Sequence, residues 1–209
     1  MTDASQVNPP LLRLAGVRLD GIGPVDLALA PGELVFITGP SGAGKTRLLR
    51  AVADLDPHEG DIWLEGNHCD TFVPCDWRRR VGWLPTESHW WARSAADHFA
   101  GVPDDAALRN LNLEPVLMKR PVEQLSTGER QRLALLRLMA NVPRVMLLDE
   151  PTASLDNGAA SRVESLIRTY VKESQGAALW VSHDAGQTGR LASRHFRMHQ
   201  GRLEAGDHP

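Results

Sequence analysis

The 209-residue chain has little cysteine and no strong excess of charge of either sign. Its two cysteines, Cys69 and Cys75, are too few to suggest a disulfide framework, which fits a reducing compartment. The formal net charge of -3 provides no cationic field for nucleic acid, and no basic run is denser than Arg78-Arg79-Arg80. We therefore expect no nucleic-acid partner.

Long apolar runs are also missing. Nowhere do about 18 apolar residues follow one another, the length that a membrane-spanning helix needs. Residues 1–6 are polar and lack the basic and apolar segments of a signal peptide. These absences predict a soluble, cytoplasmic chain, and its length suits one domain with its own core.

One short stretch offers possible metal ligands. It contains His68, Cys69, Asp70 and Cys75, but their spacing matches no common zinc pattern. Buried or incidental thiols are the favoured interpretation, with a metal site as the alternative.

Apolar runs separated by turn residues predict an α/β fold. Residues 11–19 and 25–30 read as short strands around a Gly-rich turn, and they suggest an antiparallel edge. Further buried, parallel strands are expected at residues 34–38, 80–84, 144–148 and 177–181.

Helical patterns complete this organisation. Residues 46–55 form an expected helix that stops before Pro57. Between about residues 94 and 141 the strand signals vanish, which predicts a helical lobe inserted into a core of residues 11–93 and 142–204. We expect a single domain over residues 1–209, with disorder only in the first ten and the last five residues.

A Gly-rich segment follows the expected strand at residues 34–38. Its members are Gly39, Pro40, Ser41, Gly42, Ala43, Gly44, Lys45 and Thr46. Its backbone amides and the positive end of the next helix suit phosphate groups. The full motif predicts that Lys45 reaches the β and γ phosphates of a nucleoside triphosphate and that Thr46 ligates magnesium.

Two carboxylates follow the expected strand at residues 144–148. Asp149 and Glu150 therefore lie at the carboxyl end of a buried strand, the edge where open α/β sheets bind their ligands. We expect Asp149 to serve magnesium and Glu150 to accept a proton from the attacking water.

With Leu125-Ser126-Thr127-Gly128-Glu129, Ser154-Leu155-Asp156 and His183 added, the chain resembles an ATP-binding cassette ATPase over about residues 11–204. The resemblance implies a P-loop NTPase core with a mixed sheet, ATP hydrolysis, and a head-to-tail homodimer. In such a pair, Ser126 and Gly128 cover the nucleotide held by the opposite copy. Both precede the expected helix at residues 129–140, whose amino end can face an anion.

The resemblance also implies roles for two further residues. His183 would hold the γ phosphate and orient the water and Glu150, since a neutral imidazole donates one hydrogen bond and accepts another. Asp156 would contact the opposite subunit and report its state.

Four features depart from the usual family pattern. Thr127 and Glu129 replace a Gly and a Gln, and Leu19 lies near the position of the aromatic that stacks on adenine. Thr86, followed by Glu87, stands where the family has a Gln that senses magnesium. Thr86 can still hydrogen-bond a metal-bound water, although its side chain is shorter, and substitution by Glu87 is the alternative.

Two tryptophans follow this loop. In the family, the same stretch leads to a groove that receives a helix of the membrane subunit, and exposed aromatics at Trp90 and Trp91 would suit such an interface. Packing of both rings inside the helical lobe is the alternative.

Together these features predict the ATP-hydrolysing subunit of a transporter. It would work as a dimer on a separate membrane protein, peripheral on the cytoplasmic face of the inner membrane. A finer resemblance to the small bacterial Fet-type ATPases implies iron or another metal ion as exported cargo, with lipoprotein release or other small cargo as alternatives. A soluble ATPase that uses ATP-driven dimerisation as a switch is the alternative of a different class.

Overall fold

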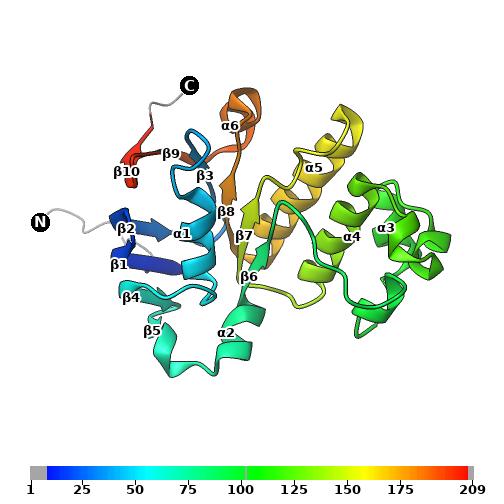
Figure 1. The fold of residues 1–209 in the computed structure, drawn as a ribbon, viewed down its shortest axis with the longest axis horizontal. Coiled ribbons are helices and arrows are strands. Elements are labelled where there is room, and N and C mark those ends of the chain that lie inside the picture. Colours follow the sequence, from blue (N-terminus) through cyan, green and yellow to red (C-terminus); the bar gives the residue numbers. More distant parts are fainter. Residues whose placement is uncertain (1–8, 102, 207–209) are drawn as a thin grey trace, which may run out of the picture.

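A six-stranded sheet organises the protein. The computed structural model describes residues 9–101 and 103–206, so most of the disorder expected at the two ends lies outside the described residues. The strand order of this sheet is β10-β9-β3-β8-β7-β6. All of its pairings are parallel except that of β10 with β9 (Figure 1).

The strands of the described residues are β1 Leu12–Leu19, β2 Ile22–Leu29, β3 Leu34–Thr38, β4 Glu59–Leu64, β5 Asn67–His68, β6 Val81–Leu84, β7 Val145–Asp149, β8 Ala177–Val181, β9 Arg194–His199 and β10 Arg202–Ala205. The helices are α1 Lys45–Val52, α2 Pro74–Arg80, α3 Asp105–Asn110, α4 Thr127–Met139, α5 Asn157–Ser174 and α6 Ala185–Leu191. Short 3₁₀ turns cover Cys69–Thr71, Ala96–His98, Pro115–Lys119 and Val122–Gln124.

The amino-terminal strands belong to a second sheet. Strands β1 and β2 pair antiparallel, as expected, but β1 also pairs with β4, and the resulting order is β2-β1-β4-β5. They therefore form a sheet of their own rather than the edge of the core sheet. The antiparallel edge of the core sheet is β10, because the β9–β10 hairpin adds it after β9 has joined β3.

The six-stranded sheet carries an apolar core on each face, because successive side chains of a strand point to opposite sides. Val35 and Ile37 face α1 and the antiparallel sheet, whereas Phe36 faces α4 and α5. All five residues of β7 and of β8 are buried. Figure 1 shows this layering, with α1 between the two sheets and with α4 and α5 on the far side of β6, β7 and β8.

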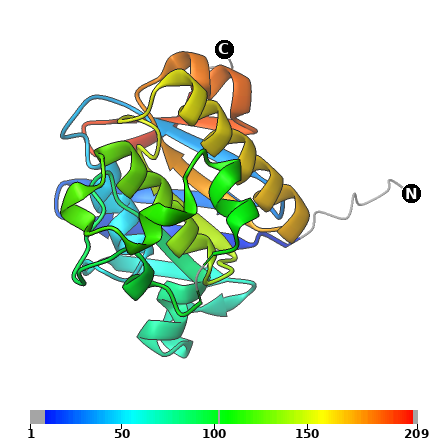
Figure 2. The ribbon, with the colours of Figure 1, turned by 90° about the vertical axis from the view of Figure 1, so that its right-hand side faces the viewer.

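The segment from residue 94 to residue 141 is helical in its described part. It contains α3, α4 and three of the 3₁₀ turns, and its one isolated bridge joins Ser94 and Pro121. Figure 2 views the molecule from the side of this segment, which lies in front of the core sheet. Leu108, Leu111 and Leu117 join it to the core cluster that contains Phe36.

No helix in the described part of the chain combines the length and the apolar content needed to cross a bilayer.

Substitution of Trp180 on β8 tests how much the core between the sheet and α5 contributes to stability. The Trp180 side chain is fully buried and stacks on Phe36, with ring centroids 5.1 Å apart. We expect Trp180→Ala to lower the free energy of unfolding by about 3–5 kcal/mol, because it removes a large buried ring. Urea unfolding followed by circular dichroism measures this change.

Trp91→Ala is the matched control, since the Trp91 side chain is 76% exposed. It should cost less than about 1 kcal/mol. Equal losses in the two variants would show that Trp180 does not stabilise this core.

Candidate functional site

The Gly-rich segment of residues 39–46, here called the phosphate loop, runs from the end of β3 into α1 and lies against β9. At Gly39 the backbone approaches β9 so closely that an added Cβ would lie 2.1 Å from the carbonyl oxygen of Met198. Gly44 precedes α1 with a φ of 104°, and an added Cβ there would lie 2.4 Å from Ile22. These two positions require glycine for backbone reasons, and they hold the loop in a tight curve at the amino end of α1.

Lys45 is the first residue of α1 and only 6% exposed. Its Nζ donates hydrogen bonds to the carbonyl oxygens of Gly39 and Pro40, at 2.8 and 3.0 Å. Burial lowers the pKa of Lys45, while the nearby carboxylates of Glu150 and Asp149 partly offset this effect. The ammonium group is therefore held inside the curve of the loop by neutral carbonyl groups.

A cavity of about 310 Å³ opens in front of this loop. Its lining residues are Ser41, Gly42, Gly44, Lys45, Thr46, Arg47, Glu150 and His183. The structure therefore brings together sequence-predicted residues from the phosphate loop, from the end of β7 and from the end of β8.

Thr46 and Asp149 contact each other directly. Thr46 Oγ1 donates a hydrogen bond to Asp149 Oδ2 at 2.8 Å, and Asp149 is only 3% exposed. A hydroxyl and a carboxylate oxygen are hard donors of the kind that magnesium prefers, and they adjoin the phosphate loop. The donor set thus fits a magnesium ion.

Glu150 and His183 form the pair at the other end of the cavity. Glu150 Oε1 lies 2.9 Å from His183 Nε2, and both side chains are partly exposed. The backbone of Glu150 has a φ of 50°, and its N–H donates to the carbonyl oxygen of Val181 at 3.0 Å. A left-handed backbone is strained for glutamate, so this bond to β8 helps to hold a conformation that aims the carboxylate at His183.

Ser126 and Gly128 lie at the amino end of α4. Ser126 accepts a hydrogen bond from Glu129 N–H, and Glu129 accepts one from Ser126 N–H, which forms a capping box. That bond from the Ser126 backbone lowers the pKa of Glu129 below its usual range. Neither Ser126 nor Gly128 lines the cavity in front of the phosphate loop of this chain.

Asp156 caps α5 beside this segment. Its Oδ1 accepts a hydrogen bond from Ala159 N–H at 2.9 Å, and this bond is the main reason that its pKa is lowered. Leu155 approaches Gly128 closely, since a Cβ added to Gly128 would lie 3.1 Å from Leu155 Cδ2. The structure therefore places Gly128 against the segment that leads to Asp156, and none of Ser126, Gly128 and Asp156 lines the phosphate-loop cavity.

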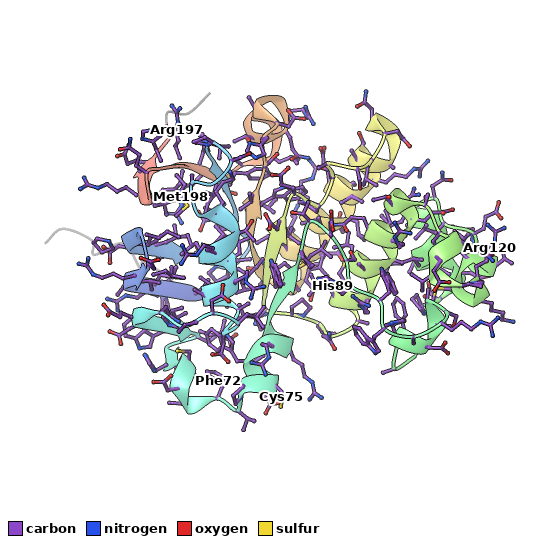
Figure 3. All side chains as sticks on the ribbon, in the orientation of Figure 1. Phe72, Cys75, His89, Arg120, Arg197 and Met198 are labelled. Carbon is purple, nitrogen blue, oxygen red and sulfur yellow. The ribbon has the colours of Figure 1, made fainter. Side chains whose placement is uncertain are left out.

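The loop after β6 is attached to α4. Gln131 is 4% exposed, and its amide donates to Pro85 O at 3.1 Å and accepts from Ser88 Oγ at 2.7 Å. Two turns further on, Arg137 donates to His89 O, at the position that Figure 3 labels between β6 and α4. Thr86, which sequence analysis assigned to metal sensing, does not line the phosphate-loop cavity.

The two tryptophans of this loop have different environments. Trp90 packs against the core cluster that contains Phe36, whereas Trp91 is 76% exposed. Arg137 lies over both rings, 4.4 and 5.1 Å from their centroids, and His98 contacts both edge-on. Trp90 is therefore partly buried in the helical segment, as the packing alternative expects, whereas Trp91 faces solvent, as the interface alternative expects.

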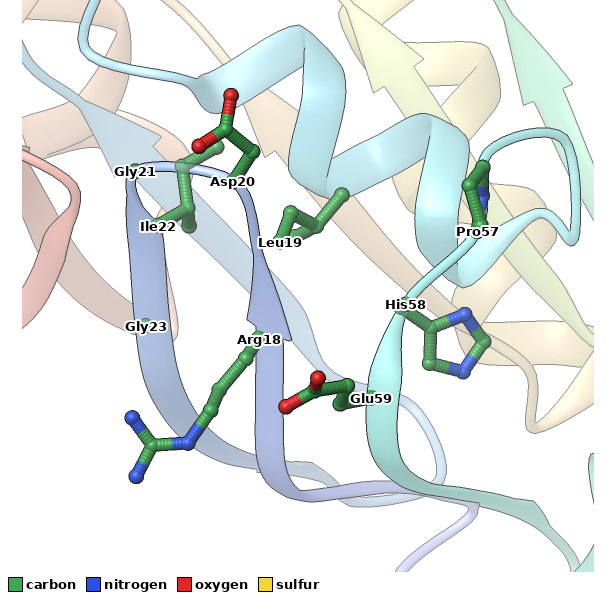
Figure 4. Close-up of a pocket in the computed structure, with 9 residues that line it drawn as sticks. All are labelled: Arg18, Leu19, Asp20, Gly21, Ile22, Gly23, Pro57, His58 and Glu59. Carbon is green, nitrogen blue, oxygen red and sulfur yellow. The ribbon is translucent and has the colours of Figure 1, made fainter.

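A second cavity, of about 620 Å³, adjoins the phosphate loop at the β1–β2 turn. Leu19 lines it from β1, and His58 lines it from the segment after α1 (Figure 4). Arg47 of α1 donates to Asp20 O at 2.8 Å and so joins this turn to the phosphate loop. His58 brings an aromatic ring to this cavity, whereas Leu19 brings an aliphatic side chain. Sequence analysis did not single out His58.

The possible metal ligands near β5 lie away from these cavities. One donor atom each from His68, Cys69 and Asp70 lie within 4.8 Å of one another, and Cys75 is outside this group. Burial raises the pKa of the Cys69 thiol, and His68 Nδ1 accepts a hydrogen bond from Asp70 N–H. His68 and Cys69 therefore each bond to Asp70, and both cysteines are free.

The fold and this site define the class of the protein. A parallel strand, a Gly-rich loop and a helix that carries Lys45 and Thr46, with an acidic pair on a nearby parallel strand, are the features of a P-loop NTPase. Residues 22–153 match the ABC transporter family. The chain therefore belongs to the ABC transporter family, and it is an ATPase subunit of that family.

Relatives with different transport roles share this sequence pattern. The probable iron export ATP-binding protein FetA of Escherichia coli K12 is 34% identical over 196 residues, which cover 86% of this chain and 87% of that protein. The Fe(3+) ions import ATP-binding protein FbpC of Streptomyces avermitilis is 36% identical, over 92% of this chain and 60% of that protein.

Solved structures share the fold. The ATP-binding cassette MJ0796, in a dimeric post-hydrolysis state bound to ADP and Pi, superposes with a TM-score of 0.81 at 22% identity, over 94% of this chain and 98% of that one. A bacterial Atm1-family ABC exporter with ATP bound gives a TM-score of 0.83 at 25% identity, over 97% of this chain and 40% of that one. The expected α/β fold is confirmed.

The left-handed backbone of Glu150 leads to a test of stability. At most positions Ala is more stabilising than Gly, but at a φ of 50° the order should reverse. We expect Glu150→Gly to be more stable than Glu150→Ala by about 1 kcal/mol, because only Gly adopts this backbone without strain.

Urea unfolding of the two variants measures the difference. The pair Arg162→Gly and Arg162→Ala, at an exposed position inside α5, should show the ordinary order, with Ala more stable by about 1 kcal/mol. If Ala is also the more stable residue at position 150, this backbone is not strained.

Proposed function

We propose that this chain is the ATP-hydrolysing subunit of an ABC transporter, and that it works as a homodimer on a separately encoded membrane protein at the cytoplasmic face of the inner membrane. The observation that carries the proposal is the convergence of Lys45, Thr46 and the Glu150–His183 pair on one cavity. Asp149 adjoins this cavity through its hydrogen bond from Thr46. A module that only bound nucleotide would not need a base and an aligning histidine at this position.

In the proposed reaction, Lys45 and the backbone amides of residues 42–46 bind the β and γ phosphates of ATP. The remaining residues of the loop, Gly39, Pro40, Ser41 and Ala43, supply the backbone that leads into and between these positions. Thr46 and Asp149 would hold magnesium, which supplies positive charge to the phosphate oxygens when it is bound.

Glu150 and His183 act on the water. The carboxylate of Glu150 orients the attacking water and accepts its proton as the γ phosphoryl group departs. His183, whose Nε2 is 2.9 Å from Glu150, then contacts the γ phosphate and keeps the carboxylate aligned. Thr86 would contribute to metal sensing only after the loop that carries it moves toward the cavity.

The dimer completes the site. Ser126 and Gly128 are exposed or half-buried at the start of a capped helix and are away from the cavity of their own chain. This placement supports a role at the nucleotide of the opposite copy, where a hydroxyl, a bare backbone and the helix amino end would face phosphate. Asp156 would contact the same partner.

For the cargo, we propose export of iron or another metal ion. The support is the similarity to FetA over 87% of that protein's length. Import of ions is the competing direction, because FbpC is similarly related.

Purification of the tagged Glu150→Gln variant from gently solubilised membranes, with ATP present, tests whether the chain is a transporter subunit. A membrane protein with several spans should be recovered with it at equal stoichiometry.

A soluble ATP-driven switch is the second candidate. It is favoured by two departures from the family pattern, Leu19 in the cavity at the β1–β2 turn and Thr86 in the loop after β6. Recovery of a soluble homodimer without a membrane protein, under the same conditions, would favour the switch over the transporter subunit.

Replacement of Glu150 by Gln tests the catalytic assignment. We expect kcat to fall by about 10²-fold or more, because the variant lacks the general base. An ATP-bound dimer should accumulate, which size-exclusion chromatography detects. Hydrolysis at the parent rate would show that Glu150 is not the base.

Trp91→Ala tests the membrane-facing surface. Because Trp91 is a large exposed aromatic on a loop tied to α4, we expect its loss to reduce recovery of the membrane protein about tenfold or more. The ATPase rate of the isolated chain should not change. Val73→Ala removes another exposed apolar side chain, on the α2 side, and should leave recovery unaffected. Equal recovery for the two variants would exclude Trp91 from this interface.

A further inference from the structure

A buried polar network lies behind the Glu150–His183 pair. Its centre is Gln187 on α6, which is only 2% exposed. The Gln187 amide nitrogen donates to Glu164 Oε1 at 2.8 Å and to Thr152 Oγ1 at 3.0 Å. Its amide oxygen accepts from Ser182 Oγ at 2.8 Å. One side chain thus joins α5, α6, the loop after β7 and the loop after β8.

The chemistry of Glu164 determines the direction of every bond in this network. An ionised carboxylate only accepts hydrogen bonds, so the NH₂ group of Gln187 must face it. The amide oxygen of Gln187 must then face Ser182, whose hydroxyl donates to it. Ser182 Oγ remains free to accept the bond from Asp184 N–H, at 3.0 Å. The network therefore has a single consistent arrangement.

This network ends on the neighbours of both proposed catalytic residues. Thr152 lies two residues after Glu150, and Ser182 immediately precedes His183. A cavity of about 640 Å³ is lined by Glu150, His183, Thr152, Ser182 and Gln187 together with residues of α5 and α6. Apart from the 2.9 Å contact of the two side chains, Gln187 is a second connection between these loops, and it is shielded from water.

We propose that Gln187 is a positioning residue for ATP hydrolysis, which fixes the loop that carries His183 relative to the loop that carries Glu150. This inference rests on the proposed roles of Glu150 and His183. Gln187 touches neither substrate nor metal in this role. It acts by holding Thr152 and Ser182 at one separation, so that the carboxylate and the imidazole keep their alignment while the nucleotide changes.

The Arg190–Glu164 ion pair adds a further contact to this network. Arg190 Nη2 lies 3.3 Å from Glu164 Oε1, the same oxygen that accepts from Gln187. An unpaired polar group in the interior is costly, so a buried network with every member paired favours one arrangement. Gln187 thereby links Thr152 and Ser182 through bonds of defined geometry.

A double-mutant cycle with His183 tests the proposal. Gln187→Met keeps the side-chain volume and removes the three hydrogen bonds. We expect kcat to fall about tenfold, with KM for ATP unchanged within about twofold, because alignment is lost and phosphate binding is not. The double variant Gln187→Met/His183→Ala should be no slower than His183→Ala alone, since Gln187 acts through His183.

Two further variants distinguish an effect on alignment from an effect on folding. Ser182→Ala removes the opposite end of the same network and should reproduce the fall in kcat if Gln187→Met proves too unstable to purify. Gln200→Met makes the same chemical change at an exposed turn and should retain the parent rate. Thermal unfolding of each variant separates a rate effect from a loss of native protein.

The outcomes distinguish this inference from the proposed function. If His183→Ala is slow but Gln187→Met is not, or if the two losses multiply in the double variant, the positioning role of Gln187 is overturned and the proposed function stands. If His183→Ala hydrolyses ATP at the parent rate, the role of His183 itself is wrong, and the positioning role fails with it.

Discussion

The parallel pairing of β3, β8 and β7 is the constraint on which the rest of this structure depends. Ile37 is opposite Val181, and Val181 is opposite Asp149, so the three strands end along one line. The residues that follow each strand are the phosphate loop, the His183 loop and Glu150. Because side chains alternate along a strand, a slip of one residue in either pairing would turn Asp149 away from Thr46.

Burial on both faces holds this register. One core lies between the sheet and the antiparallel strands, and the other lies between the sheet and α4 and α5. With β7 and β8 buried along their whole length, the loops at their carboxyl ends start from a rigid base. That base sustains the strained backbone of Glu150 and a buried lysine, both of which would relax in a looser structure.

Two buried glutamine side chains each hydrogen-bond to separate segments of the chain. Gln131 joins the loop after β6 to α4, and Gln187 joins the loops after β7 and β8. Each amide both donates and accepts, so it connects two segments with a defined separation, which an apolar side chain does not do. By contrast, Ser126 and Asp156 accept hydrogen bonds only within local helix caps, and both residues are exposed.

Much of the fold and part of the site could be predicted from the sequence. The bounds of β3 and β8 agree with the expected strands, and the phosphate loop could be predicted in full, because apolar runs and glycines act through local backbone preferences. Strands β4, β5, β9 and β10 were missed. Strand β9 has charged and half-buried side chains, and it is a strand because its backbone bonds to β3. By itself, the sequence determined the local chemistry of phosphate binding and the acidic strand end. Only the tertiary structure decided that Gln187 meets Glu164, Thr152 and Ser182, because such meetings depend on strand order and register rather than on neighbours in the chain.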